Sequence, residues 1–301
     1  MKPPSHHHPP TERHSVAWML LSIVLYAGNV LILRAAAEAS PVADAWVATA
    51  FRGVIGLVLV AALFGGRGFQ ARNLVSRPLV LARGLVGAVA ILLFYFTIPH
   101  LGAGRAVILN LTYPVFAGLM AQYWIGESMS RRQWGWMLAS LAGLMIFLGS
   151  DAWKPGAIVW ELVGLLGAIT AGGAVVLIRE LRHSEHPSTV FASQCLWSLA
   201  LTLPFSFGSV RSLPSGVLAA LIGAAVLVGL AQLAMTHAFR SLSVARGSAI
   251  QMLLPLLTTL GGMALFNERL SLLEVVGAAL TLWGTFEAVR PRASPAAAPA
   301  R

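Results

Sequence analysis

The sequence predicts an all-α integral membrane protein with ten transmembrane helices arranged as two inverted five-helix repeats. Hydrophobic residues make up 57% of the 301 residues and charged residues only 11%, whereas a soluble domain carries about 25% charged residues. The apolar residues gather in ten runs, each close to the roughly 20 residues that cross a bilayer. The pattern of one run recurs 141 residues later in the chain.

The apolar runs set the expected helices. In the first half they lie near Val16–Leu33, Val42–Phe64, Pro78–Ile98, Ala103–Trp124 and Trp134–Gly149. In the second half they lie near Trp160–Ile178, Thr189–Phe205, Gly216–Phe239, Val244–Phe266 and Leu272–Val289. The runs are too long and too continuous for the alternating strands of a membrane barrel. They place the two repeats at residues 16–149 and 157–289.

The two ends of the chain differ from the apolar runs. Residues 1–15 and 290–301 are rich in proline and in small or polar residues, so we expect two disordered tails. The His6–His8 run is compatible with metal binding, but adjacent histidines in such a tail do not define a site, and we expect no metal and no cofactor. The first apolar run is long and continues into the bundle, so we expect no cleaved signal peptide. The single cysteine, Cys195, excludes a disulfide framework.

The basic residues predict the orientation in the membrane. With the N-terminus inside, fourteen Lys and Arg residues fall on the cytoplasmic side, and five fall on the other side: Arg34, Arg105, Lys154, Arg211 and Arg269. This bias predicts a multi-pass protein of the cell (inner) membrane with both tails cytoplasmic. Because the arginines lie between apolar runs, the charge of +10 indicates contact with the lipid bilayer and not with nucleic acid. Both a monomer and a homodimer fit the sequence.

The repeat is clearest in two segments, NLTYPVFAGLMAQYWIGESMS at 110–130 and QMLLPLLTTLGGMALFNERLS at 251–271. A shift of 141 aligns Pro114 with Pro255 and Glu127 with Glu268. A shift of 145 aligns Arg34 with Arg179. Because each half has an odd number of helices, the second half enters the membrane inverted, an architecture common among carriers.

The segments PVFAGL, GESMS and QWGWML, with LPLLTTL and NERLS in the second half, resemble EamA-type members of the drug/metabolite transporter superfamily. The resemblance covers residues 16–289, and Asn267 replaces the glycine that usually precedes the glutamate. It implies a ten-helix carrier for a small-molecule substrate, often an amino acid or related metabolite, frequently moved outward.

Polar residues at membrane depth are the candidates for substrate binding, because a charge there costs about 2.5–3.5 kcal/mol. Arg52 lies near the middle of its run. It either acts in substrate binding or gating, or is a structural arginine whose N–H groups bond to carbonyls at helix ends. Arg83 is closer to the end of its run, where it could snorkel to the surface. Asn110 and Gln251 match under the shift of 141 and either bind substrate or join helices. The further candidates are Asn29, Tyr95, Tyr113, Gln194, Trp197 and Gln232.

The repeated prolines and glutamates are expected to be structural. Pro114 and Pro255 remove a backbone donor and should kink their helices. Glu127 and Glu268 should cap or pair locally with Arg131 and Arg269.

The function that these residues predict is secondary transport. No midplane carboxylate, Walker lysine loop, HExxH or GxSxG motif occurs, which argues against ATP hydrolysis and the commonest hydrolases. We therefore expect a carrier, not an enzyme, that exports a small polar or zwitterionic metabolite through a central cavity. Arg52 would attract the substrate's carboxylate, and Asn110 and Gln251 would bind its polar groups. Uptake of a metabolite and flipping of a lipid-linked intermediate are the alternatives.

Overall fold

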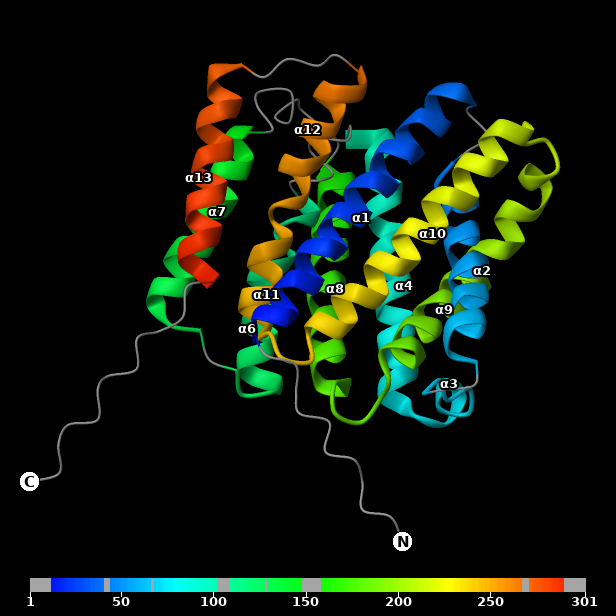
Figure 1. The fold of residues 1–301 in the computed structure, drawn as a ribbon, viewed down its shortest axis with the longest axis horizontal. Coiled ribbons are helices and arrows are strands. Elements are labelled where there is room, and N and C mark those ends of the chain that lie inside the picture. Colours follow the sequence, from blue (N-terminus) through cyan, green and yellow to red (C-terminus); the bar gives the residue numbers. More distant parts are fainter. Residues whose placement is uncertain are drawn as a thin grey trace, which may run out of the picture.

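The structure is a computed structural model and describes residues 12–40, 44–65, 68–101, 109–127, 129–147, 158–266 and 271–289. This part of the chain folds into a bundle of α-helices (Figure 1). The predictions for residues 1–11 and 290–301, for His6–His8 and for Glu268 lie outside the described residues. Residues 12–15, which were expected to belong to the disordered tail, instead form the start of helix α1 (Glu12–Ala39), because the helix continues past the apolar run.

The helices follow the predicted runs closely. The first half contains α1 (Glu12–Ala39), α2 (Ala45–Phe64), α3 (Asn73–Ser76), α4 (Pro78–Leu101), α6 (Tyr113–Trp124) and α7 (Arg131–Phe147). The second half contains α8 (Ile158–Leu181), α9 (Pro187–Val210), α10 (Ser215–Ala238), α11 (Val244–Gln251), α12 (Leu254–Phe266) and α13 (Leu272–Val289). Seven of the ten expected spans are long and apolar enough to cross a membrane. The other three correspond to α6, α7 and α13, which have 12, 17 and 18 residues in the described part.

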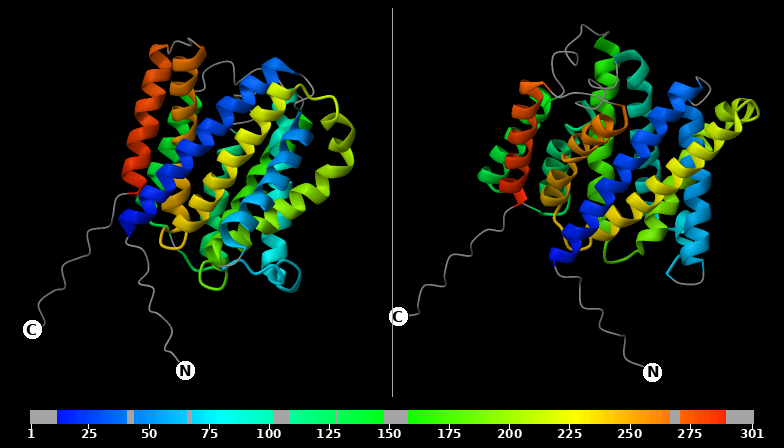
Figure 2. Two further views of the ribbon diagram at one scale, coloured as in Figure 1. Left: turned by 45° about the vertical axis from the view of Figure 1, so that its right-hand side comes forward. Right: turned by 45° about the horizontal axis from the view of Figure 1, so that its top comes forward.

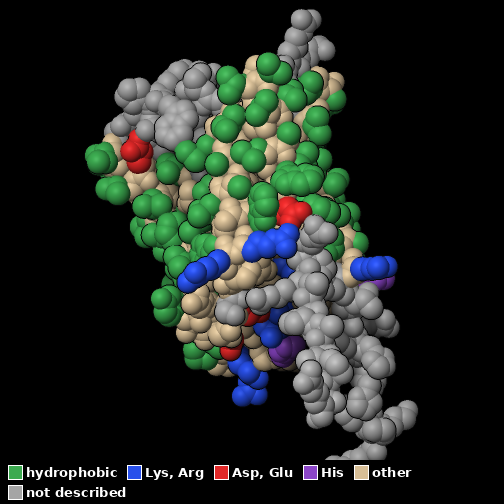
Figure 3. Space-filling model, turned by 90° about the vertical axis from the view of Figure 1, so that its left-hand side faces the viewer, with side chains coloured by type: hydrophobic (Ala, Val, Ile, Leu, Met, Phe, Trp, Pro, Cys, Tyr) green, Lys and Arg blue, Asp and Glu red, His purple; other side chains and the backbone are tan. Residues whose placement is uncertain are grey.

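The surface of the bundle suits a bilayer. On the face formed by α7 and α13, hydrophobic side chains cover the upper part, and Lys and Arg side chains gather in the lower part (Figure 3). Leu272, Trp283 and Phe286 are among the exposed apolar side chains of α13. The start of α1 and the end of α13 lie toward this same lower end of the bundle (Figure 2). The arginine-rich end is therefore also the end at which the described chain begins and finishes.

The two proline segments are broken, so the prediction of single kinked helices over Ala103–Trp124 and Val244–Phe266 is wrong in its detail. A turn at Met252–Leu253 separates α11 from α12. A turn at Leu111–Thr112 likewise precedes α6. Pro114 and Pro255 are each the second residue of the following helix, α6 and α12. A missing N–H costs nothing there, because the first turn of a helix has no internal partner for it.

The helices pack in pairs that join the two halves of the chain. Helix α1 packs on α10 and α4 on α8, while α2 packs on α9 and α7 on α13. In the last pair, Ser140 Oγ donates to the Thr281 carbonyl over 3.1 Å. Thr281 Oγ1, which donates to the Gly277 carbonyl over 2.9 Å, also lies 3.4 Å from the Ser140 carbonyl. Gly143 and Gly284 allow this approach, because a Cβ on either would lie within 2.7 Å of a backbone nitrogen of the other helix. Small residues commonly make such close membrane-helix contacts.

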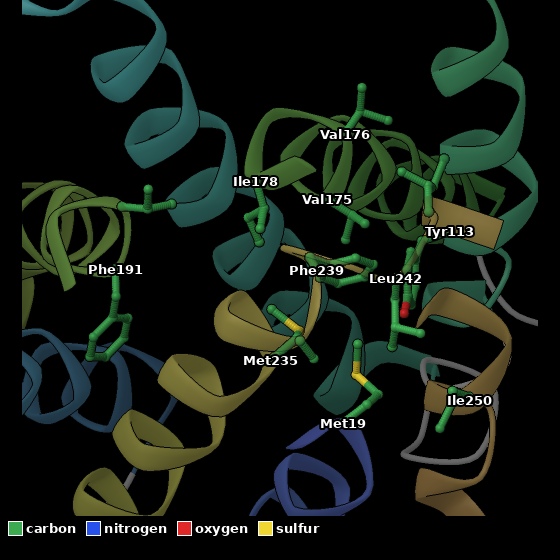
Figure 4. Close-up of a cluster of buried hydrophobic side chains, with 14 of the residues drawn as sticks. Met19, Tyr113, Val175, Val176, Ile178, Phe191, Met235, Phe239, Leu242 and Ile250 are labelled. Carbon is green, nitrogen blue, oxygen red and sulfur yellow. The ribbon is translucent and has the colours of Figure 1, made fainter. Parts of the chain in front are cut away.

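A hydrophobic core fills the crossing of α1, α8, α10 and α11 (Figure 4). Its members include Met19, Ile178, Phe239, Leu242 and Ile250, all at most 3% exposed. Phe239 and Leu242 belong to the short connection between α10 and α11. The arginine-rich end of the bundle is therefore closed by tightly packed apolar side chains.

Candidate functional site

A buried polar cluster lies where α1, α2 and α10 meet. Arg52 of α2 is 9% exposed, and its Nη2 donates to Oε1 of Gln232 on α10 over 3.2 Å. The Tyr26 hydroxyl of α1 donates to the same oxygen over 2.6 Å. One amide oxygen therefore joins three helices, and Arg52 lies inside the bundle, away from both surfaces.

Arg83 extends the cluster onto α4 and α9. It is 2% exposed, so the prediction that it snorkels to the surface is wrong. Its Nη2 donates to Oε1 of Gln194 over 2.9 Å, and Nε2 of Gln194 donates to the Gly87 carbonyl over 3.3 Å. A Cβ on Gly87 would lie 2.1 Å from Nη1 of Arg83. The glycine thus leaves room for the guanidinium to lie along its own helix.

The cluster holds positive charge without a balancing carboxylate. No described Asp or Glu forms an ion pair with Arg52 or Arg83. Nε and Nη1 of Arg83 and Nε2 of Gln232 are buried and have no hydrogen-bond partner among the described residues. Each buried donor without a partner costs about 1–3 kcal/mol, and more when it is charged. The arrangement therefore suits an anionic group that comes from outside the chain.

Other predicted site residues lie around this cluster or apart from it. Tyr95 lies on α4, the helix that also carries Arg83. Trp197 is on α9, almost one turn beyond Gln194, and its indole N–H has no partner in the described part of the chain. Asn29 instead donates to the Ala224 carbonyl over 2.8 Å. It joins α1 to α10 and is not part of the cluster.

The aligned amides, Asn110 and Gln251, do not bond to each other. Gln251 Oε1 accepts from the Tyr113 hydroxyl over 2.8 Å, and its Nε2 lies 3.5 Å from Met19 Sδ. Asn110 is half-buried and makes no side-chain hydrogen bond to any other described residue. Gln251 and Tyr113 therefore join α11 to α6, and a role for these residues in substrate binding stays a prediction.

The sequence predicted a local pair between Glu127 and Arg131, but the structure shows a different partner for Glu127. Its Oε1 accepts from Nε of Arg179 over 2.6 Å, and its Oε2 accepts from the Val244 N–H over 2.9 Å. Gly126 has φ +68°, a conformation that glycine adopts without strain, and it turns the chain at the end of α6. Glu127 does cap a helix, but that helix is α11 of the other half.

Sequence reasoning missed Tyr26 and Arg179. Tyr26 lies inside the first apolar run, where a tyrosine resembles an ordinary packing residue. Arg179 aligns with Arg34 under the shift of 145, and that match was the available signal. Among described His, Cys, Asp and Glu residues, no group of three or more could hold a metal ion.

Comparison with known proteins decides the family. The EamA-like transporter family matches residues 14–149 and 158–289. The chain belongs to this family. It is therefore a multi-pass membrane transporter of the EamA type, as the resemblance implied.

Two curated relatives and a solved structure are also similar. The chain is 28% identical over 193 residues to the pseudopaline exporter CntI of Pseudomonas aeruginosa strain UCBPP-PA14, covering 60% of this chain and 65% of the relative. It is 30% identical over 171 residues to the protein of the same name in strain PAO1, covering 56% and 57%. The chain thus spans less than two thirds of these relatives. A crystal structure with 19% identity matches 91% of this EamA-like chain and 96% of its own, with a TM-score of 0.75, which shows a shared fold.

Proposed function

We propose that this EamA-like transporter exports a small polar or zwitterionic metabolite that carries a carboxylate, such as an amino acid. The observation that carries the proposal is the pair of buried arginines, Arg52 and Arg83, neither of which is bonded to a carboxylate among the described residues. The Nε and Nη1 groups of Arg83 also have no partner there. Such groups are retained inside a membrane protein where they meet a ligand or a partner. The relatives named as exporters of pseudopaline support the outward direction.

The proposed mechanism is alternating access between two inverted five-helix repeats, residues 16–149 and 157–289. The two separate matches to the family support this division. The helix pairs support it as well. In the proposed repeats α1 corresponds to α8 and α4 corresponds to α10, so the contact of α1 with α10 and the contact of α8 with α4 are equivalent. Ser140 and Thr281 are equivalent under the shift of 141 and contact each other reciprocally, as residues next to a pseudo-twofold axis do. The polar cluster takes residues from both proposed repeats, as a site between repeats requires.

The proposed location is the inner membrane, with both tails in the cytoplasm. The excess of arginine at the end of the bundle where α1 begins and α13 finishes supports this orientation (Figure 3). Arg131, Arg132, Arg179, Arg182 and Arg240 all lie at helix ends or in connections there.

Counterflow in proteoliposomes tests the proposal. The vesicles are loaded with a panel of amino acids and carboxylate-free metabolites, and labelled uptake is followed for the wild type and for Arg52→Ala. The control is Arg211→Ala, because Arg211 is exposed and lies 5.5 Å over the Phe207 ring. We expect counterflow of a carboxylate-bearing solute to fall at least tenfold in Arg52→Ala, the loss of about one charged hydrogen bond, and to persist in Arg211→Ala. Equal transport of carboxylate-free solutes by all three proteins would reject the proposal.

A second candidate is a flippase for a lipid-linked intermediate. An apolar cavity of about 320 Å³ lies between α1, α12 and α13 and is lined by residues that include Leu20, Ile23, Leu256 and Leu282. Such a cavity suits an acyl or prenyl chain. Transfer of a fluorescent lipid headgroup between leaflets of proteoliposomes would favour this candidate, and its absence during active counterflow would favour the carrier.

A further inference from the structure

One ion pair ties together helix ends from both halves of the chain at the arginine-rich end. Glu127 follows α6, and Arg179 lies in the last turn of α8. The Arg179 Nε–Glu127 Oε1 distance is 2.6 Å. The second carboxylate oxygen accepts from the Val244 N–H at the start of α11. The carboxylate thus holds a side chain of one helix and the backbone of another.

Arg179 extends this connection to the end of α10. Its Nη1 donates to the carbonyls of Phe239 and Arg240 over 2.8 and 2.9 Å. Glu127 and Arg179 together therefore fix the ends of α6, α8 and α10 and the start of α11. Arg182 adds a weaker contact, with its Nη1 3.9 Å from Glu127 Oε1.

Directly connected to this ion pair is the apolar layer that closes the same end of the bundle. Phe239, Leu242 and Val244 are at most 1% exposed, and the first two lie in the core beside Met19 and Ile178 (Figure 4). Phe239 directly follows the last residue of α10 and lies seven residues, about two turns, beyond Gln232 of the polar cluster. A solute that moves from this end of the bundle toward Gln232 must therefore displace the layer that the ion pair holds.

The exposure of the pair suits a contact that opens and closes. The side chains of Arg179 and Glu127 are 11% and 21% exposed. Water can therefore reach both groups when they separate, which avoids the several kcal/mol that stranding a fully buried ion would cost. Their hydrogen bonds are charge-assisted and short, so the closed arrangement is well defined.

We propose that Glu127 and Arg179 form the latch that holds the arginine-rich end of the transporter closed. They are positioning residues for transport, and this proposal rests on the alternating-access function proposed above. Breaking the latch lets Phe239 and Leu242 move with the α10–α11 connection and opens a path to the polar cluster. Closing it commits the substrate to the opposite side.

A cysteine placed between the latch and the cluster tests the proposal without knowledge of the substrate. The native cysteine is removed by Cys195→Ala, and Thr236→Cys introduces a thiol of similar size at a residue that is 4% exposed and one turn from Gln232. A charged, membrane-impermeant maleimide is applied to right-side-out and to inverted vesicles. The latch variant is Glu127→Gln, which keeps the shape of the side chain and removes its charge. The control is Glu287→Gln, which breaks an ion pair with Arg132 at the same end but between α7 and α13.

We expect Glu127→Gln to raise the labelling rate at least tenfold from the arginine-rich side alone, because a lost charged hydrogen bond shifts a two-state equilibrium by about this factor. Arg179→Gln should give the same result, and Glu287→Gln should label like the parent. An unchanged rate in properly folded Glu127→Gln protein, or an equal increase from both sides, would overturn the latch. A failure of counterflow for every carboxylate solute would count against the proposed substrate and leave the labelling result unaffected.

Discussion

Replacing Arg83 and Gln194 together with apolar side chains of similar size should make the unliganded transporter more stable and inactive. The change is the double variant Arg83→Met/Gln194→Leu. Arg83 is buried between α4 and α9 with one hydrogen bond, to Gln194, and with Nε and Nη1 unpartnered among the described residues. We interpret these vacant donors as reserved for substrate, at the expense of stability.

The magnitude follows from the groups that are lost and gained. Exchanging buried ionic groups for packed apolar ones is neutral or stabilising by about 1–4 kcal/mol. The Gly87 carbonyl loses the donor from Gln194, and a typical hydrogen bond contributes about 0.5–1.5 kcal/mol. The free energy of unfolding should therefore rise by roughly 1.5 kcal/mol, the middle of a combined range of about −0.5 to +3.5 kcal/mol. Transport of a carboxylate-bearing solute should be lost.

Unfolding in detergent micelles, followed by tryptophan fluorescence during a denaturant titration, measures this free energy. The matched control is Arg179→Met, because Arg179 donates to Glu127 and to two backbone carbonyls. Removing it takes the charged donor away from Glu127 and from both carbonyls, and because water reaches the Glu127 carboxylate, we expect a loss of about 1–3 kcal/mol. A double variant at Arg83 and Gln194 that is less stable than wild type by more than about 1 kcal/mol would refute the reasoning, since Arg83 would then be a satisfied structural group.

Three further substitutions have defined outcomes. A Cβ at Gly284 would lie 2.7 Å from the Ser140 nitrogen, so Gly284→Val should lower stability by about 1–3 kcal/mol. The control Gly223→Val has open space around its Cβ and should keep the stability of the wild type. Equal thermal midpoints for the two variants would contradict this prediction. Gly126→Ala should lower stability by about 1–2 kcal/mol because of its positive φ, and a midpoint at or above wild type would argue against strain there. His186 caps α9 through Ser188 N, and burial, then Arg240 and His237, lower its pKa. The stability from its neutral ring is therefore present above the unfolded pKa of about 6.5 and is lost as pH falls below that value. His186→Asn should reduce the pH dependence of the thermal midpoint between about pH 7 and 5. An unchanged pH dependence in this variant would assign the effect to another group.

The sequence was sufficient for features that depend on one helix at a time. The apolar runs located the helices, and the position of Arg52 within its run placed it inside the bundle. The match of Pro114 with Pro255 located the two breaks, although it suggested kinks. Each of these inferences uses only the length of a run, the depth of a residue or the geometry of proline.

Features that depend on packing between distant helices were predicted poorly. Arg83 is five residues from the start of α4, which suggested the surface, but α9 packs against this part of α4 through Ser193 and the Val80 carbonyl. For Glu127 the nearest arginine along the chain is Arg131, whereas the partner observed is Arg179, 52 residues away. Sequence distance cannot rank such partners, because the crossing of helices decides which of them meet.

The reciprocal contact between Ser140 and Thr281 has a consequence for how this molecule can change. On the proposed two-repeat architecture, a half of this kind could pair with an inverted copy of itself, and every substitution in such a homodimer would appear twice. In one continuous chain each substitution appears once. Arg52 and Arg83 both come from the first half, while Gln194 and Gln232 come from the second. The covalent join thus allows a nearly symmetric scaffold to hold an asymmetric polar cluster, in which one half supplies the cations and the other half supplies the amides that accept their hydrogen bonds.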